Sequence, residues 1–221
     1  MLLLAFDTAT PAVTVALHDG ERVLAERTTV DARRQGELLS PHIAEVLAAA
    51  GVTPADLGLV AVGVGPGPFT GLRVGVVTAL VIGEALGIDV VGVCSLDVLA
   101  AEAVSSGAVH DSFLVTTDAR RREVHYAAYD VVDGRAIRAD GPAVAAPADV
   151  ERRDRPVVGR GADLYAEVLG PRVGPVDPSA AVLASYAVAE RTAGRALLDA
   201  VPLYLRRPDA VVPGPPKPVR S

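Results

Sequence analysis

Tryptophan is absent from the sequence, and aromatic residues make up only 4% of its 221 positions. Proteins that bind single-stranded nucleic acid use exposed aromatic side chains to stack bases, so this composition does not favour an extended stacking platform. Cys94 is the only cysteine, which excludes an intrachain disulfide and fits a reducing compartment. Half of the residues are hydrophobic, and we expect a core of Val, Leu and Ala in an α/β protein.

Long basic stretches are also lacking, and the net charge is −6. Phosphate neutralisation dominates nucleic-acid affinity, so an acidic chain of this kind is a poor stand-alone binder of tRNA or DNA. The run Arg120-Arg121-Arg122 is short and typical of a solvated surface. The apolar start at residues 1–6 reaches Asp7 without a basic region, so we expect neither a signal peptide nor a membrane span, and we expect a cytoplasmic protein.

Histidine pairs with metal-ligand spacing are missing. The four histidines are His18, His42, His110 and His125, and no two of them lie four residues apart. A metalloprotease of the His-Glu-x-x-His type is therefore excluded, and a lone histidine is usually structural or exposed. We expect no metal site and no bound cofactor.

The loop from Gly65 to Arg73 (GPGPFTGLR) is the most informative motif present. It follows an apolar run at residues 59–64 that predicts a buried strand, and it precedes a helical pattern, as a phosphate-binding loop does. It lacks the Walker lysine and fails the dinucleotide spacing. We expect Thr70 to cap a helix beginning near Gly71. A purely structural turn and a phosphate cradle both remain open.

Two apolar helices are predicted beside this loop. The first is expected within 35–50, and two starts remain open: Ser40 caps a helix whose first residue is Pro41, or the helix starts near Gln35 and Pro41 kinks it. The second follows the loop and is apolar nearly all round, with small residues every four positions on one face: Gly71, Gly75, Ala79 and Gly83. Both helices pack on one sheet, and two alternatives remain: they stop there, or together they dock onto a partner.

One module occurs twice in the sequence. A strand at residues 2–7 is followed by a second at 12–18 and by Asp19-Gly20, and this plan recurs at 113–118, at 123–132 and at Asp133-Gly134. Asp-Gly pairs favour hairpins. The sequence therefore predicts two related α/β lobes with mixed β-sheets flanked by helices. We place the N-terminal lobe at 1–104, the C-terminal lobe at 105–212 and a disordered Pro-rich tail at 213–221.

A duplicated lobe whose first strand ends in Asp resembles the duplicated ribonuclease H-like fold of the actin-like ATPases, sugar kinases and Hsp70. The sequence resembles most closely the TsaB (YeaZ) family of bacterial tRNA threonylcarbamoyladenosine biosynthesis proteins. The resemblance spans most of the chain and rests on residues 6–9, 65–75, 93–96, 118–126 and 202–206.

This resemblance implies a non-catalytic scaffold that binds and activates a catalytic paralogue, TsaD, in a complex completed by the ATPase TsaE. The complex installs threonylcarbamoyl on N6 of adenosine 37 in tRNAs reading codons that begin with A. It also implies a homodimer when the chain is alone, contact with tRNA only through the complex, and no membrane association. Ser95 and Leu99 align where TsaD-like proteins carry metal-binding histidines, and Gln35 stands where the family often has His. Our candidates for the partner interface are Leu39, Ile43, Val46, Leu47, Gly71, Leu72, Val74 and Gly75.

An alternative is an ATP-dependent small-molecule kinase or ATPase of the same fold. Its nucleotide cleft, present or vestigial, would involve Asp7, Thr8, Gly65, Gly67, Thr70 and Asp118. An Asp at a strand end also satisfies turns through its own side chain, so a structural role for Asp7 and Asp118 stays open.

Overall fold

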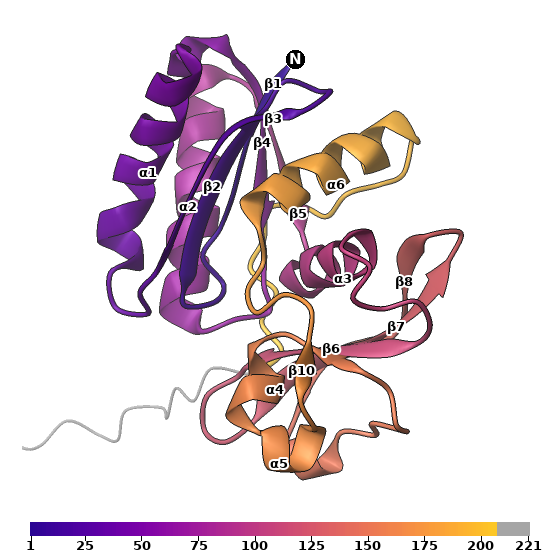
Figure 1. The fold of residues 1–221 in the computed structure, drawn as a ribbon. Helices are drawn as coiled ribbons and strands as arrows, with labels where there is room; N and C mark the ends of the chain where they lie inside the picture. The colour runs from indigo at the N-terminus through magenta and orange to yellow at the C-terminus, as the bar shows by residue number, and fades with distance from the viewer. Residues whose placement is uncertain (207–221) are drawn as a thin grey trace, which may run out of the picture.

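The computed structural model describes residues 1–206, which form two lobes, each built on a mixed five-stranded sheet (Figure 1). The first sheet has the order β3-β2-β1-β4-β5 and contains β1 (Leu2–Asp7), β2 (Ala12–His18), β3 (Val23–Val30), β4 (Leu57–Gly63) and β5 (Asp89–Val93). The second has the order β10-β9-β6-β7-β8 and contains β6 (Phe113–Asp118), β7 (Val124–Val132), β8 (Arg135–Ala145), β9 (Val157–Val158) and β10 (Arg172–Val173). The predicted tail at 213–221 lies outside the described residues.

The two sheets have the same topology. β1 pairs antiparallel with β2 and parallel with β4, while β6 pairs antiparallel with β7 and parallel with β9. The outer strands β3 and β8 extend the antiparallel side, and β5 and β10 extend the parallel side. The duplicated ribonuclease H-like architecture that we predicted from sequence is therefore confirmed.

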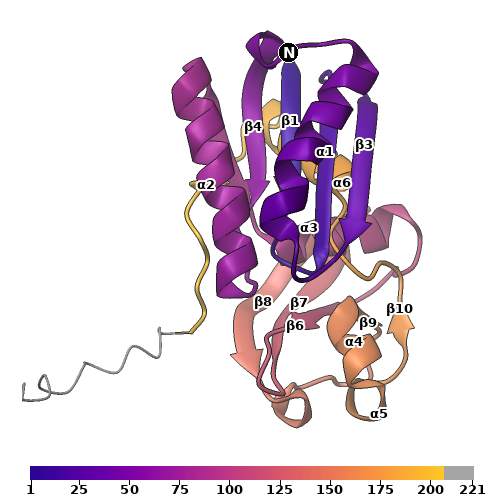
Figure 2. The ribbon, with the colours of Figure 1, turned by 90° about the vertical axis from the view of Figure 1, so that its left-hand side faces the viewer.

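Helices cover both faces of the first sheet, which explains why β1 and β4 are almost uniformly apolar. Helices α1 (Gln35–Ala50) and α2 (Phe69–Leu86) lie side by side on one face (Figure 2). Leu4 and Phe6 of β1 point into the core beneath them. Helix α6 (Ala180–Thr192) lies on the opposite face, where Leu183 and Ala187 pack against Leu3 of β1.

The helix between the sheets, α3 (Ser95–Ser105), packs against the second sheet although it precedes that sheet in the chain. Its Leu99 and Ala103 share a core with Phe113 and Tyr129. Conversely, α6 follows the second sheet and covers the first. Each lobe therefore takes one helix from the other half of the chain.

Short elements complete the described chain: η1 (Pro54–Asp56), η2 (Pro147–Asp149), α4 (Arg160–Leu164) and α5 (Ala166–Leu169). After α6 the chain returns to the first lobe, where Leu203 N donates to Val64 O (2.8 Å). Both predicted Asp-Gly turns are present. Asp133 and Gly134 form a two-residue hairpin loop with positive φ, whereas Asp19-Gly20 belongs to a four-residue loop.

We made one prediction for the start of α1 and another for the start of α2, and the structure agrees with the first and contradicts the second. Helix α1 begins at Gln35 and contains Pro41, as one of our two alternatives expected. The capping role predicted for Thr70 is wrong. Helix α2 begins at Phe69 with Pro68 at the N-cap and no side-chain cap hydrogen bond, so Thr70 lies inside the first turn. Pro68 supplies a fixed φ there, which replaces the hydroxyl cap as the local cause of the helix start.

Candidate functional site

Asp7, at the end of β1, is buried and both carboxylate oxygens are occupied. Ala9 N donates to Oδ1 (2.6 Å) and Ser95 Oγ donates to Oδ2 (2.6 Å). Burial raises the pKa of the Asp7 carboxyl above its usual value, and the hydrogen bonds from Ser95 and Ala9 oppose that rise. Asp7 thus stabilises the β1–β2 turn through Ala9 and connects the end of β1 to Ser95 at the start of the helix at Ser95–Ser105.

The Gly65 loop is filled by the chain itself. Gly65 N donates to Ser95 Oγ (3.2 Å), and Gly65 O accepts from Ser95 N (2.8 Å). A Cβ at Gly67 would collide with Ala9 O, so the loop lies directly on the β1–β2 turn. The Gly65 N–H is therefore engaged by Ser95 within the chain, which favours the structural alternative at this position.

The small-residue face of α2 packs on the same turn. Thr8 Oγ1 donates to Gly71 O (2.8 Å), and a Cβ at Gly75 would come within 2.5 Å of Thr8 Oγ1. Gln35 Nε2 donates to Thr10 O (2.8 Å) from the start of α1. Hence the close approach predicted for this face occurs against the chain's own β1–β2 turn.

Asp118 occupies the corresponding position in the second lobe, at the end of β6. Its Oδ1 accepts from Arg120 N (2.8 Å), and Arg120 Nη1 lies 3.3 Å from Oδ2. Asp118 is partly exposed, in contrast to Asp7. The two aspartates therefore lie in different environments. Asp7 is buried, whereas Asp118 is partly exposed and accepts a hydrogen bond from Arg120 N in the β6–β7 turn.

Metal-binding groups are not assembled within the part of the chain described here. No cluster of three His, Cys, Asp or Glu side chains suitable for a metal ion occurs among residues 1–206. The two positions aligned with paralogue ligands have other uses, because Ser95 binds Asp7 and Leu99 is buried in the core. His42 Nε2 pairs with Thr29 Oγ1 (2.9 Å), and burial lowers the pKa of His42.

Most of the predicted interface residues point inward. The buried members are Leu39, Val46, Leu47, Gly71, Leu72 and Gly75, whereas Ile43 and Val74 are partly exposed. The six buried residues pack on the sheet or on its turns.

Exposed apolar side chains do lie on the outer face of α2. Val77, Leu80 and Val81 are 56%, 47% and 60% exposed. By length and composition alone, α2 is also the one helix within residues 1–206 that could cross a membrane. The sequence shows that this helix is apolar nearly all round, but its helical period does not tell which apolar face packs on the sheet. We call Val77, Leu80 and Val81 the α2 patch.

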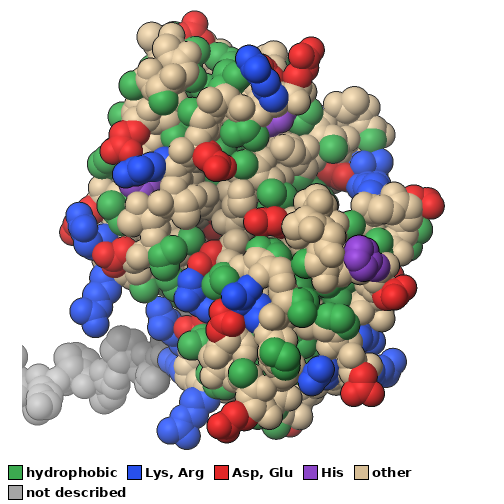
Figure 3. Space-filling view, viewed as in Figure 1, with side chains coloured by type: hydrophobic (Ala, Val, Ile, Leu, Met, Phe, Trp, Pro, Cys, Tyr) green, Lys and Arg blue, Asp and Glu red, His purple; other side chains and the backbone are tan. Residues whose placement is uncertain are grey.

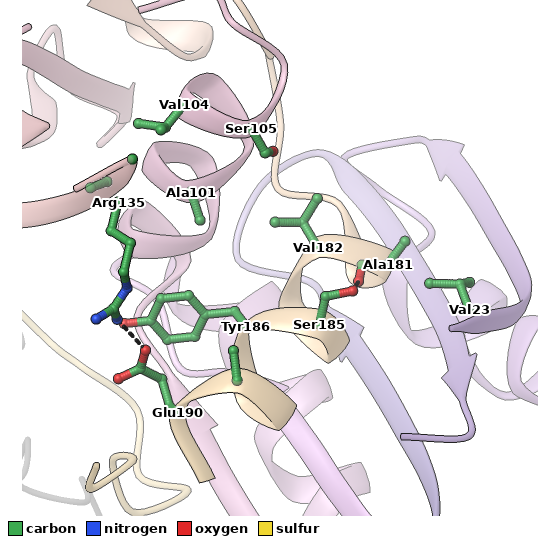
Figure 4. Close-up of a pocket in the computed structure, with 13 residues that line it drawn as sticks. Val23, Ala101, Val104, Ser105, Arg135, Ala181, Val182, Ser185, Tyr186 and Glu190 are labelled. Carbon is green, nitrogen blue, oxygen red and sulfur yellow. Dashed lines mark hydrogen bonds and ion pairs between the residues drawn. The ribbon is translucent and has the colours of Figure 1, made fainter. Parts of the chain in front are cut away.

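A cavity of about 430 Å³ opens between α3, α6 and the β7–β8 turn (Figure 4). Its walls are largely apolar, with Ala101 and Val104 on α3 facing Val182 on α6. Glu190 closes one end by accepting from Arg135 Nη2 (2.5 Å) and Arg195 Nε (2.6 Å). Burial raises the pKa of the nearby Tyr186 hydroxyl to about 12, so it stays protonated. This cavity could not be predicted from the sequence, since its walls come from segments far apart in the chain.

Charged side chains of both signs are interspersed over the face of the molecule drawn in Figure 3. This face carries no large patch of a single sign. Long-range attraction of a polyanion by this face is therefore weak.

Two sheets of identical order with exchanged helices define the class: a two-lobed α/β protein of the duplicated ribonuclease H-like, actin-like ATPase type. The model of the family described as TsaD, tRNA N6-adenosine threonylcarbamoyltransferase, matches residues 22–176. YeaZ from Pseudomonas aeruginosa superposes with a TM-score of 0.78 and 31% identity, covering 92% of this chain and 99% of that one.

Sequence relatives agree with this structural match. The chain is 32% identical over 135 residues to the Bacillus subtilis tRNA threonylcarbamoyladenosine biosynthesis protein TsaB, covering 61% of this chain and 57% of that protein. It is 48% identical over 212 residues to an uncharacterized protein of Mycobacterium tuberculosis, covering 94% and 93% of the two chains. The chain belongs to the TsaB (YeaZ) family.

Proposed function

We propose that this chain is the non-catalytic subunit of a complex that transfers threonylcarbamoyl to N6 of adenosine 37 in tRNAs reading codons that begin with A. In this proposal it binds and activates a TsaD-type catalytic subunit, TsaE completes the assembly, and tRNA is engaged only within the complex. The chain acts in the cytoplasm and forms a homodimer when alone. The proposal rests on two observations: the chain belongs to the TsaB (YeaZ) family, and its α2 patch is exposed.

The chemistry of the α2 patch supports a protein partner. Three aliphatic side chains on successive turns form a stripe, and the neighbouring α1 adds the partly exposed Ile43. A contiguous apolar surface of this kind typically marks a protein interface. The Val74 side chain of α2 lies 3.9 Å from where a Cβ at Gly36 of α1 would stand, so the two helices are in contact at this point.

The absence of catalytic features supports the non-catalytic part of the proposal. Asp7 is engaged by Ser95 and Ala9, the Gly65 loop is packed on Ala9, and no metal cluster gathers in the part of the chain that the structure describes. The kinase or ATPase alternative needs an open phosphate site at these residues, and so it is less well supported.

The test is to place a charge in the α2 patch. Val81→Glu is expected to abolish co-elution with the TsaD-type subunit, because burying an unpaired carboxylate weakens an apolar interface by roughly a hundred-fold or more. Val168→Glu is the matched control, since Val168 is also exposed (51%) but lies on α5 of the other lobe. Gly75→Arg is unsuitable, because the new side chain would displace Thr8 inside the fold.

Activity is then measured by reconstituting tRNA modification from purified synthase, TsaD, TsaE and this chain, with mass spectrometry of threonylcarbamoyladenosine. Omission of this chain and use of the Val81→Glu variant should both abolish the product, while Val168→Glu should support it. Product formed at the same level without the chain, or full co-elution of folded Val81→Glu, would refute the proposal. Magnesium-dependent ATP hydrolysis by the isolated chain would instead favour the kinase alternative.

A further inference from the structure

The cavity between α3, α6 and the β7–β8 turn has the size and lining of a small-molecule site (Figure 4). Its volume of about 430 Å³ lies within the range of ligand pockets, which are mostly apolar and carry a few polar groups. The cavity lies on the α6 side of the first sheet, whereas the α2 patch lies on the opposite side. The function proposed above makes no use of this cavity.

Aliphatic side chains from both lobes form the body of the cavity. Ala101 and Val104 come from α3, which packs on the second sheet, and Val182 comes from α6, which packs on the first. Val23, at the start of β3, adds a further aliphatic wall. Tyr186 is the one aromatic residue in the lining. Short aliphatic groups therefore shape most of the walls, and they suit a flexible aliphatic chain.

One end of the cavity carries a net positive charge. Glu190 accepts hydrogen bonds from Arg135 Nη2 and from both Nε and Nη2 of Arg195. The hydrogen bonding from Arg195 lowers the pKa of Glu190, so its carboxyl is ionised at neutral pH. The neighbouring Asp97 and Arg138 pair with each other (3.3 Å) and cancel. Two guanidinium groups against one carboxylate leave one positive charge, which favours a ligand with one negative charge.

Two side chains at this end keep hydrogen-bond donors for a ligand. The Tyr186 hydroxyl makes no hydrogen bond to another residue within 1–206, and burial raises its pKa to about 12, so it keeps its proton. A guanidinium has five N–H groups, and within the same residues Arg135 uses only Nη2, toward Glu190. Figure 4 shows the Tyr186 side chain directed toward Arg135 and Glu190. A phenol donor beside a guanidinium is suited to hold a carboxylate.

We propose that this cavity binds an aliphatic monocarboxylate of medium chain length, with its carboxylate beside Tyr186 and Arg135 and its chain along Ala101, Val104 and Val182. A single carboxylate matches the one net positive charge, whereas a phosphate monoester brings nearly two negative charges. The bound acid contacts α3, α6 and the β7–β8 turn together, and so it connects the two lobes. This inference goes beyond the proposed function and does not depend on it.

The test is isothermal titration calorimetry of the full-length chain with sodium octanoate below its micellar concentration, with butyrate and octylammonium as separate probes. Tyr186→Phe removes only the hydroxyl that is expected to donate to the carboxylate. Tyr165→Phe is the matched control, because Tyr165 lies at the N-cap of α5 and outside the cavity. Ala189→Trp fills the cavity from an exposed position on α6, away from the core beneath that helix. Thermal melts by circular dichroism check that each variant is folded.

We expect octanoate to bind at one site, roughly ten-fold or more tightly than butyrate, because each buried methylene strengthens binding by up to about four-fold. Tyr186→Phe should weaken octanoate binding roughly ten-fold, since it removes a hydrogen bond to a charged group. Octylammonium has the opposite charge on the same chain and should bind roughly ten-fold or more weakly than octanoate. Ala189→Trp should abolish octanoate binding, and Tyr165→Phe should bind as the wild type does.

The proposal is overturned if octanoate shows no saturable binding, if octylammonium binds as tightly as octanoate, or if Tyr186→Phe and Tyr165→Phe bind octanoate equally. Val81→Glu should bind octanoate as the wild type does, because Val81 lies on α2, on the other side of the first sheet. Weakened octanoate binding by folded Val81→Glu would place the acid on the α2 patch and would also overturn the cavity site. Co-elution with the TsaD-type subunit therefore tests the interface alone, and the octanoate titration tests the cavity alone.

Discussion

Replacing Ser95 by alanine tests whether Asp7 is a structural anchor or a phosphate-handling residue. The substitution removes the 2.6 Å hydrogen bond to Asp7 Oδ2 and leaves Gly65 N without its acceptor. A hydrogen bond to a charged group contributes about 2 kcal/mol, and a neutral one about 1 kcal/mol. We therefore expect Ser95→Ala to lower the free energy of unfolding by about 3 kcal/mol, which for a chain of this size lowers Tm by roughly 6–12 °C.

The sign of the pH dependence follows from the pKa of Asp7, which burial raises in the folded state. A raised pKa means that the folded protein holds this proton more tightly than the unfolded chain. The resulting stability is complete below the unfolded pKa and is lost as pH rises through the folded pKa. The hydrogen bond from Ser95 matters most to the ionised carboxylate, so the effect of Ser95→Ala should be larger at neutral pH than at acid pH.

Urea denaturation and circular dichroism of Ser95→Ala, Asp7→Asn and the double variant measure this coupling. Asp7→Asn keeps an acceptor for Ala9 N without burying a charge, so Ser95→Ala should cost less in that background. Equal losses in both backgrounds, or a Ser95→Ala variant that melts with the wild type, would show that the serine does not hold the carboxylate. Under the structural interpretation Asp7→Asn retains tRNA modification in the reconstituted assay, whereas a catalytic carboxylate would not tolerate it.

Two further predictions concern glycine packing and acid stability. Gly36→Ala should stabilise the protein by roughly 0.5–1 kcal/mol, because the new Cβ would meet only Val74 at 3.9 Å. Gly75→Ala should destabilise the protein, because the new Cβ would lie 2.5 Å from Thr8 Oγ1. Thermal melts of the two variants measure both effects. Because burial lowers the pKa of His125 to about 4, its contribution to stability is present above the unfolded value of about 6.5 and is lost as pH falls toward 4. His125→Gln should therefore remove up to about 3 kcal/mol of acid sensitivity across that window in urea titrations, and an unchanged pH profile would contradict the assignment.

The repeated strand plan and the Asp-Gly turns were enough to predict the two-lobed fold, because hairpins and apolar strands are encoded locally. The apolar period predicted helix α1, and its observed start at Gln35 is one of the two starts that Pro41 left open. The start of α2 was missed by two residues, since the fixed φ of Pro68 begins the helix without the hydroxyl cap that Thr70 suggested.

Side-chain roles that depend on distant segments were harder to predict. Ser95 lies 88 positions from Asp7, and only the folded chain reveals that it holds the carboxylate. The apolar residues of α2 were all visible in the sequence, but the small residues Gly71 and Gly75 mark the face that the chain covers itself. The exposed apolar residues Val77 and Val81 lie on another face, which sequence alone could not choose because the helix is apolar nearly all round.

The exchange of α3 and α6 between the lobes has a consequence for synthesis on the ribosome. The first sheet emerges early, but Leu3 and Leu59 on one face wait for Leu183, which is made more than a hundred residues later. Until α6 emerges, that face of the sheet is an exposed apolar surface. Two fragments divided near residue 105 would each lack the helix that covers their own sheet. The nascent chain should therefore depend on chaperones until α6 is released, and its halves should recover a native state only when they are mixed.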